Sequence, residues 1–147
     1  MDAIEVEPGV GIGPVQIGMT RHQVIRAAEA AGLDVRLIRR WPDKPEVLIV
    51  SDQIQAYFGP DDLVEQAESA FSPTAVRYGA IDLGGRAADV KAELDRIAEP
   101  DANDRHYPAS LCYLTLGLCL WKDAKPSDWA KDDPYESVLV QVPVGET

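Results

Sequence analysis

The stretch GVGIGPVQIGMTRHQV, residues 9–24, carries the clearest structural signals in the chain. Apolar and polar residues alternate over residues 15–17, which predicts a short extended segment. Thr20 stands three residues before Gln23, and this spacing is typical of a capping box at the start of a helix. The stretch therefore predicts an extended lead-in followed by a capped helix over residues 21–31.

The glycines of this stretch do not match a phosphate-binding loop. A dinucleotide fingerprint has the spacing G-x-G-x-x-G, whereas Gln16 occupies the position of the third glycine here. A P-loop continues from its last glycine with Lys and then Ser or Thr, whereas Met19 follows Gly18. Glu5 and Glu7 would also repel a phosphate near the loop. We therefore exclude nucleotide binding by this stretch.

The same pattern returns 66 residues later, in YGAIDLGGRAADVKAELDRIAEP, residues 78–100. At this shift Gly18 coincides with Gly84 and Val24 with Val90, so glycines and apolar positions repeat although few residues are identical. Such self-similarity is typical of a duplicated supersecondary unit.

The chain is therefore interpreted as a single domain, residues 1–147, built of two repeats over about 9–72 and 75–144. Arg86 replaces Thr20 in the second repeat, so the second helix is expected to start without the same cap. Strand-like segments follow the helices. They cover residues 34–41, 46–52, 54–59, 62–71, 110–121 and 136–144. This order predicts an α+β fold in which antiparallel meanders form one curved sheet, with the helices on one face.

The segments VQIGMTRHQV and, more weakly, IDLGGRAADV resemble the BamE/SmpA-like and β-lactamase-inhibitor-protein-like group. Members of that group open with an apolar-Gly-Met-Thr segment and a helix, followed by a curved antiparallel sheet, and the inhibitor protein is itself a tandem repeat. The resemblance implies a rigid sheet surface that binds another protein, as in a bacterial immunity protein, and it brings no catalytic residue. The secreted inhibitor has a disulfide in each repeat, whereas the first half of this chain has no cysteine.

Charge and composition narrow the choice of partner and compartment. The chain has 14 basic and 25 acidic residues, a net charge of −11, spread over both repeats. Such a surface disfavours nucleic acids and anionic membranes and favours a basic protein partner. A run of about 18 apolar residues, as a membrane helix needs, is missing, and the acidic start MDAIEVEPG lacks signal-peptide features. We expect a cytoplasmic protein.

Cysteine and histidine give little indication of chemistry. Cys112 and Cys119 would lie on opposite faces of one strand, whereas a hairpin would bring them together; two reduced core thiols are the expectation for the cytosol. His22 and His106 lack a second His or Cys at metal-binding spacing. A general-base role for His106 among nearby acids is the weaker alternative. We therefore predict no enzyme activity, metal or cofactor.

Aromatic and acidic residues point instead to an interface. The segment 121–136, WKDAKPSDWAKDDPYE, has the composition of a surface that meets a basic partner. The turn 57–62, YFGPDD, is its counterpart in the first repeat and is expected to lie beside it in a shared sheet. In the alternative interpretation the aromatic residues pack at the sheet margin and the acids solvate a loop. The predicted partner-binding residues are Tyr57, Asp61, Asp62, Trp121, Asp123, Asp128, Trp129, Asp132, Asp133 and Tyr135.

These observations predict a non-catalytic inhibitor of immunity type, which neutralises a basic toxin or enzyme by occluding it, as in a toxin–antitoxin pair. An accessory scaffold, or a module that binds a small ligand in the concavity of the sheet, is the alternative. Salt dependence distinguishes these two functions, because electrostatic capture of a basic protein slows as the salt concentration rises, whereas binding of an apolar ligand does not.

Overall fold

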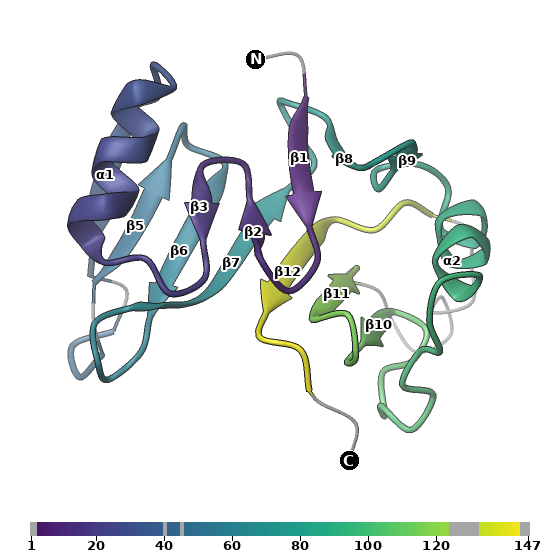
Figure 1. The fold of residues 1–147 in the computed structure, drawn as a ribbon. Coiled ribbons are helices and arrows are strands. Elements are labelled where there is room, and N and C mark those ends of the chain that lie inside the picture. Colours follow the sequence, from purple (N-terminus) through teal and green to yellow (C-terminus); the bar gives the residue numbers. More distant parts are fainter. Residues whose placement is uncertain (1–2, 40, 45, 124–132, 145–147) are drawn as a thin grey trace.

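The computed structural model describes residues 3–39, 41–44, 46–123 and 133–144, in which twelve strands and two helices are found (Figure 1). In chain order these are β1 (Ile4–Glu7), β2 (Gly11–Ile12), β3 (Val15–Gln16), α1 (Arg21–Ala30), β4 (Val35–Ile38), β5 (Val47–Val50), β6 (Ile54–Phe58), β7 (Val64–Ala70), β8 (Val76–Tyr78), β9 (Ile81–Asp82), α2 (Ala87–Asp95), β10 (Ser110–Tyr113), β11 (Leu118–Trp121) and β12 (Ser137–Gln141).

The strands form two sheets, so the expected α+β fold with one curved sheet is wrong. A five-stranded sheet has the order β3-β2-β1-β8-β9, and a seven-stranded sheet has the order β10-β11-β12-β7-β6-β5-β4. The described helices have only 10 and 9 residues, which makes the fold mostly β. The lead-in segments are extended, as predicted, but they do not join the large sheet. Strand β1 pairs in parallel with β8 and each segment adds a hairpin, so together they build the smaller sheet.

The two halves of the chain repeat the same local structure. The β2–β3 hairpin pairs Ile12 with Val15, and 66 residues later the β8–β9 hairpin pairs Tyr78 with Ile81. The helices begin at the same shift. In the seven-stranded sheet β7 and β12 are neighbours at the junction, with the other strands of the first half on one side and those of the second half on the other. This arrangement fits the two-repeat interpretation.

The glycines of residues 9–24 serve the backbone of the first hairpin. A Cβ atom at Gly11 would lie 2.2 Å from the carbonyl oxygen of Val15, so only glycine permits the two strands to pair this closely. Gly13 has a φ of +54°, in the left-handed region that glycine adopts without steric cost. The stretch therefore specifies a tight β2–β3 turn.

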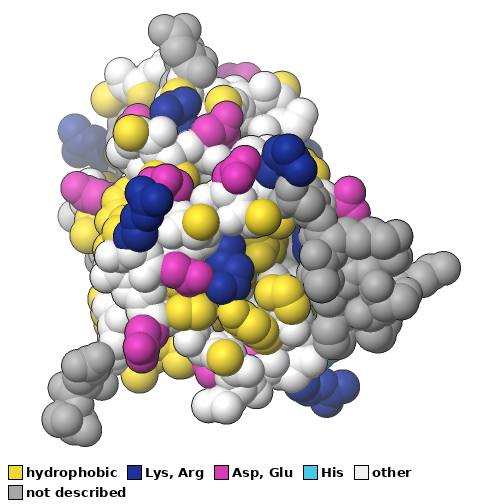
Figure 2. Space-filling model, turned by 90° about the vertical axis from the view of Figure 1, so that its right-hand side faces the viewer, with side chains coloured by type: hydrophobic (Ala, Val, Ile, Leu, Met, Phe, Trp, Pro, Cys, Tyr) yellow, Lys and Arg dark blue, Asp and Glu magenta, His cyan; other side chains and the backbone are white. Residues whose placement is uncertain are grey.

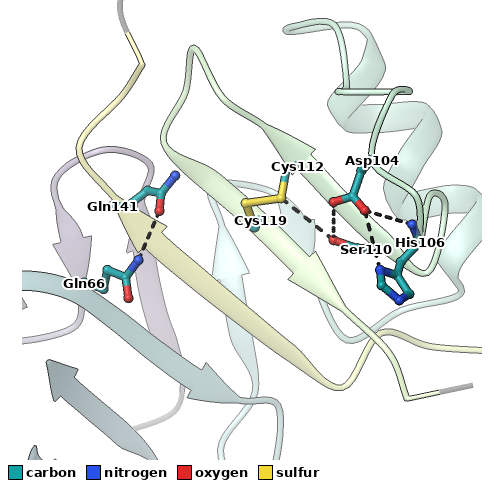
Figure 3. Close-up of a disulfide and its surroundings, with 7 residues drawn as sticks. All are labelled: Gln66, Asp104, His106, Ser110, Cys112, Cys119 and Gln141. Carbon is teal, nitrogen blue, oxygen red and sulfur yellow. Dashed lines mark hydrogen bonds and ion pairs between the residues drawn. A yellow bond between two sulfur atoms is a disulfide. The ribbon is translucent and has the colours of Figure 1, made fainter.

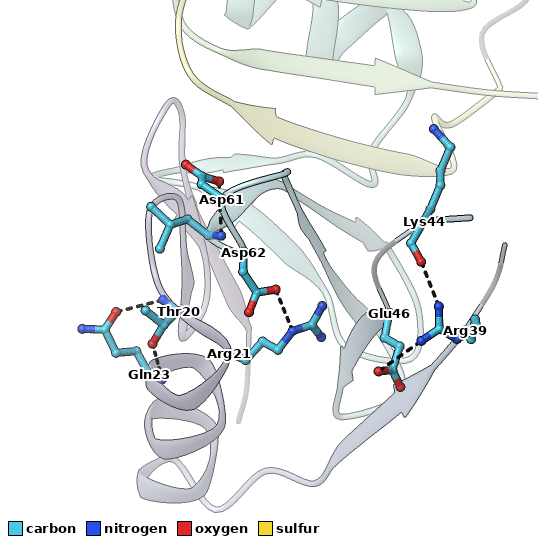
Figure 4. A network of polar contacts seen from close by, with 9 residues as sticks. Thr20, Arg21, Gln23, Arg39, Lys44, Glu46, Asp61 and Asp62 are labelled. Atoms are coloured by element: carbon cyan, nitrogen blue, oxygen red, sulfur yellow. Dashed lines mark hydrogen bonds and ion pairs between the residues drawn. The ribbon is translucent and has the colours of Figure 1, made fainter. Parts of the chain in front are cut away.

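The start of α1 matches the predicted capping box (Figure 4). The backbone N–H of Gln23 donates to Thr20 Oγ1 at 3.2 Å, and the N–H of Thr20 donates to Gln23 Oε1 at 2.9 Å. The helix then runs from Arg21 to Ala30, within one residue of the predicted end. At α2 the N-cap residue Arg86 makes no side-chain capping hydrogen bond, as predicted.

Replacing Thr20 by Ala should lower the free energy of unfolding by about 1 kcal/mol, because a backbone N–H in the first turn of α1 loses its acceptor. Urea denaturation followed by circular dichroism measures the change. Thr20→Ser is the matched control, since it keeps the hydroxyl and should stay close to the wild type. Equal losses in both variants would show that the methyl group of Thr20, and not the cap, stabilises this end.

The core lies between the two sheets and the helices. Strand β6 alternates buried Ile54, Ala56 and Phe58 with partly exposed residues, and β12 likewise buries Val138 and Val140. Figure 1 shows α1 and the smaller sheet on the same side of the seven-stranded sheet. The inner face of the large sheet is therefore the floor of the core.

A polar cluster ties α2 to the edge of the large sheet. The fully buried Tyr113 of β10 donates its hydroxyl to Asp95 Oδ1 at 2.8 Å, and Lys91 Nζ lies 2.6 Å from Asp95 Oδ2. Burial, with the hydrogen bond to Asp95, raises the pKa of Tyr113 far above its ordinary value. Burial also raises the pKa of Tyr135, to about 12, and its hydroxyl donates to the carbonyl oxygen of Pro108 at 2.8 Å.

The two raised tyrosine pKa values predict a loss of stability at alkaline pH. Above about pH 10 a tyrosine in the unfolded chain releases its proton, whereas Tyr113 and Tyr135 retain theirs in the folded protein, so rising pH favours unfolding. Each group contributes about 1.4 kcal/mol per pH unit up to its folded-state pKa. Urea midpoints measured across this range should fall more steeply for the wild type than for Tyr113→Phe. Equal slopes would contradict the prediction.

Candidate functional site

The second face of the seven-stranded sheet presents a continuous set of partly exposed side chains. Register places Gln55 opposite Glu68, Glu68 opposite Leu139, and Leu139 opposite Cys119, so one row crosses four strands. The residues between them in sequence are buried on the inner face. We name this second face the outer face. Its side chains come from Gln55, Tyr57, Gln66, Glu68, Ser110, Cys112, Cys119, Trp121, Leu139 and Gln141, together with the buried Ile49.

Hydrogen bonds fix several side chains of the outer face. The hydroxyl of Tyr57 lies 2.7 Å from Gln55 Oε1 and 2.9 Å from Glu68 Oε1, so it bridges two strands. Gln66 Nε2 donates to Gln141 Oε1 at 3.2 Å, across the β7–β12 junction (Figure 3). Side chains held in this way lose little conformational entropy when they bind a partner.

A hollow of about 400 Å³ lies on this face, beside the connection between β4 and β5. Arg39 shapes that connection, because it donates to the carbonyl oxygen of Lys44 at 3.2 Å and its Nη2 lies 3.6 Å from Glu46 Oε1 (Figure 4). The indole of Trp41, 43% exposed, stands at the hollow. The residues that line it are Trp41, Lys44, Val47, Tyr57, Phe58, Gln66, Glu68 and Leu139.

The two cysteines form a disulfide on the outer face, so the expectation of two reduced core thiols is wrong (Figure 3). Residues 114–117 make a turn that pairs β10 with β11 and places Cys112 directly opposite Cys119, with a Cα–Cα distance of 4.0 Å. Both are partly exposed, whereas Leu111 and Tyr113 are buried, so Cys112 does not point inward. The hairpin alternative is confirmed.

An ordered loop flanks this disulfide. Asp104 accepts hydrogen bonds from the backbone N–H of His106 at 2.8 Å and from Ser110 Oγ at 2.9 Å. The first of these bonds contributes most to lowering the pKa of Asp104. The His106 ring meets Trp121 edge-on, with 5.8 Å between the ring centroids. An activated serine nucleophile donates its hydroxyl hydrogen to a base such as histidine. Ser110 donates to the carboxylate of Asp104 instead, so we assign its hydroxyl a structural role.

The predicted partner-binding residues of the first repeat lie in two places, the outer face and the β6–β7 turn. Tyr57 lies on the outer face, as described above. Asp62 pairs with Arg21, whose Nε lies 2.9 Å from Asp62 Oδ1, and Asp61 Oδ1 accepts from the N–H of Leu63 at 3.4 Å (Figure 4). Asp61 therefore has a structural partner within the β6–β7 turn, and Asp62 has one at the start of α1.

The predicted partner-binding residues of the second repeat differ in their exposure. Trp121 is 40% exposed on the outer face, whereas Tyr135 is buried, in agreement with packing at the sheet margin. Asp123 and Asp133 are exposed. Three further predicted residues, Asp128, Trp129 and Asp132, lie outside the described residues.

The turn 57–62 does not lie beside the described parts of the segment 121–136, which are residues 121–123 and 133–136, so that expectation is wrong for these residues. Gln66, near the start of β7, pairs with Gln141 at the end of β12, and Ala70 at the end of β7 pairs with Ser137. The β6–β7 turn and the approach to β12 are therefore at opposite ends of the sheet. Antiparallel pairing of β7 with β12 is the physical reason, because it reverses the direction of the second repeat relative to the first.

Sequence reasoning missed the centre of the outer face, including Gln55, Gln66, Glu68, Leu139 and Gln141. Part of the signal was present, since the polar residues Gln66 and Glu68 are two positions apart and are separated by the small residue Ala67. Figure 2 shows the side of the molecule that carries α2, where acidic and basic side chains are interspersed with apolar ones. The acidic side chains therefore do not form one continuous negative patch on this side.

Across the described ranges, neither helix combines the length and apolar character that crossing a bilayer requires. The same ranges hold no cluster of three or more His, Cys, Asp and Glu side chains that could bind a metal ion. Comparison with family models, curated proteins and solved structures gave no match for the chain. The resemblance to the BamE/SmpA-like and β-lactamase-inhibitor-protein-like group stays a prediction.

Proposed function

We propose that the protein is a non-catalytic inhibitor of immunity type, which uses the outer face to occlude a basic toxin or enzyme. The observation that carries the proposal is the broad row of side chains on this face, which runs from β6 across β7 and β12 to β11 and is held in part by hydrogen bonds of Tyr57 and Gln66. A preorganised sheet surface offers area and fixed geometry, both of which favour protein binding.

Aromatic side chains supply candidate anchors at both ends of the row. Trp41 and Trp121 are 43% and 40% exposed, and Tyr57 and Leu139 lie between them on the same face. Interfaces are enriched in Trp and Tyr, and a few such residues usually provide most of the binding energy. The composition of the outer face therefore suits a protein partner.

The net charge of −11 supports a basic partner. Long-range attraction between a negative protein and a positive one accelerates their encounter, and the acceleration falls as salt rises. We propose the cytoplasm as the site of action, where an immunity protein meets an intracellular toxin. Disulfides are rare in that compartment, so alkylation of Cys112 and Cys119 in freshly lysed cells tests the location. If neither cysteine reacts with the alkylating reagent, the disulfide is intact in the cell and the protein belongs to an oxidising compartment instead.

The experiment compares capture of a target by the wild type and by Leu139→Arg, which puts a bulky cation at the centre of the outer face. We expect the wild type to recover one basic protein and to inhibit its activity when both are purified. Leu139→Arg should lose at least about 100-fold in affinity, equivalent to about 2.7 kcal/mol. Ile97→Arg is the control for the added cation, because Ile97 is an apolar residue with an exposed side chain that lies beyond α2, away from the outer face. Equal inhibition by Leu139→Arg and the control would overturn the proposal.

A further inference from the structure

The hollow on the outer face contains two opposite charges. Lys44 and Glu68 are the charged residues among the described lining, and the other residues supply aromatic rings, apolar groups and one amide. Its volume of about 400 Å³ falls in the range of small-molecule sites, which extends from about 300 to 1,000 Å³. The hollow is therefore large enough for a small ligand.

Glu68 enters the hollow without a cation of its own. Its Oε1 atom is 2.9 Å from the hydroxyl of Tyr57, and its cross-strand neighbours Gln55 and Leu139 are uncharged. Among the described residues it forms no ion pair. A partly buried carboxylate with one neutral hydrogen-bond donor can still accept a cation.

Lys44 brings the complementary charge from the other side of the hollow. Its backbone carbonyl is held by Arg39, while its side chain extends away from Arg39 and Glu46 (Figure 4). The ammonium group makes no ion pair within the described ranges, with Glu68 or with any other residue. Two opposite charges thus line one hollow without neutralising each other.

We propose that this hollow binds a small zwitterion of the α-amino-acid class, including its N-methylated betaine forms. The ligand's ammonium group lies at Glu68, where the rings of Trp41 and Tyr57 add cation–π attraction. Its carboxylate lies at Lys44. Val47 and Leu139 provide apolar surface for the remaining carbon atoms. This site extends beyond the proposed inhibitor function and does not depend on it.

The same lining disfavours the other common ligand classes. A phosphate-bearing ligand would bring two or more negative charges to a hollow that holds one ammonium and one carboxylate, and to a chain with a net charge of −11. A divalent cation would find one carboxylate and a repelling lysine, which is too few oxygen ligands for a stable site. A ligand with one charge of each sign matches both groups.

Calorimetric titration with glycine betaine tests the proposal. Acetate and tetramethylammonium are titrated for comparison, because each carries only one of the two charged groups of glycine betaine. We expect glycine betaine to bind the wild type at least about tenfold more tightly than either half. Glu68→Gln should weaken glycine betaine about tenfold without weakening acetate, and Lys44→Met should weaken glycine betaine without weakening tetramethylammonium, because each substitution removes a charge that repels that half. Glu65→Gln, a charge removal at an exposed position on β7, is the matched control and should bind like the wild type.

Two results would overturn the proposal. One is the absence of heat of binding for the folded wild type, checked by circular dichroism, with glycine betaine and with L-leucine at tens of millimolar. The other is equal affinity for the zwitterion and for its halves. Neither result affects the capture experiment with Leu139→Arg, so failure of the zwitterion site and failure of the inhibitor function are distinguishable.

Discussion

Replacing Tyr113 by Ala is expected to lower the free energy of unfolding by about 3–5 kcal/mol, the range for deleting a large buried aromatic side chain. Tyr113 is fully buried and is the largest fully buried side chain among the residues that the structure describes. The substitution leaves a cavity between β10 and α2, and it also removes the hydroxyl that donates to Asp95. Because the native state is only marginally stable, a loss of this size should shift the urea midpoint strongly.

Tyr113→Phe separates the two contributions. It keeps the ring and removes the hydroxyl, so it should cost about 1.5–3 kcal/mol, the range for a hydrogen bond to a charged group. Lys91 still pairs with the carboxylate of Asp95 in this variant, which limits the loss. Urea denaturation of both variants at neutral pH gives the comparison. A Phe variant as unstable as the Ala variant would show that the hydrogen bond to Asp95, and not packing, holds α2 against the sheet.

Local signals predicted the elements of this fold better than their assembly. The capping box at Thr20 identified the start of α1, because it depends on two residues three positions apart. The parallel pairing of Ile4 with Val76 depends on segments about 70 residues apart, and two-residue strands such as β3 and β9 carry almost no pattern of their own. Single-sequence periodicity cannot select a partner for such segments. The five-stranded sheet was therefore missed.

The candidate site was predictable in part for the same reason. Tyr57 and Trp121 stand out in the sequence because aromatic residues are uncommon, and both lie on the outer face. Glu68 and Lys44 do not stand out among 25 acidic and 14 basic residues. They line one hollow because the β4–β5 connection lies beside β7 in the folded chain. The two residues are far apart in the sequence, and no sequence motif links them. Their shared position is a property of the tertiary structure.

The cysteines show how one turn changes an interpretation. On a single strand the odd spacing of Cys112 and Cys119 separates them, and burial of free thiols was then the simplest expectation. The left-handed φ of +72° at Gly117 belongs to the turn that reverses the chain, and reversal puts both sulfur atoms on the outer face. The stabilising role of this bond can be tested directly.

Replacing both Cys112 and Cys119 by Ala should lower the free energy of unfolding by about 2.5 kcal/mol, the chain-entropy value for a loop closed over a sequence separation of 7. The unfolded chain gains conformations when the crosslink is lost, whereas the β10–β11 backbone pairs remain in the folded state. Urea denaturation of the oxidised wild type and the double variant measures the difference.

Reduction of the wild type by a dithiol is the matched comparison, because it opens the bond without changing the sequence. A loss similar to that of the double Ala variant would show that the crosslink itself stabilises the edge of the sheet. If neither reduction nor substitution moves the urea midpoint, then the core contacts of Leu111 and Leu120 hold the hairpin without the disulfide. In that case the bond between the two strands would be dispensable for the outer face, and reducing conditions would leave target capture unchanged.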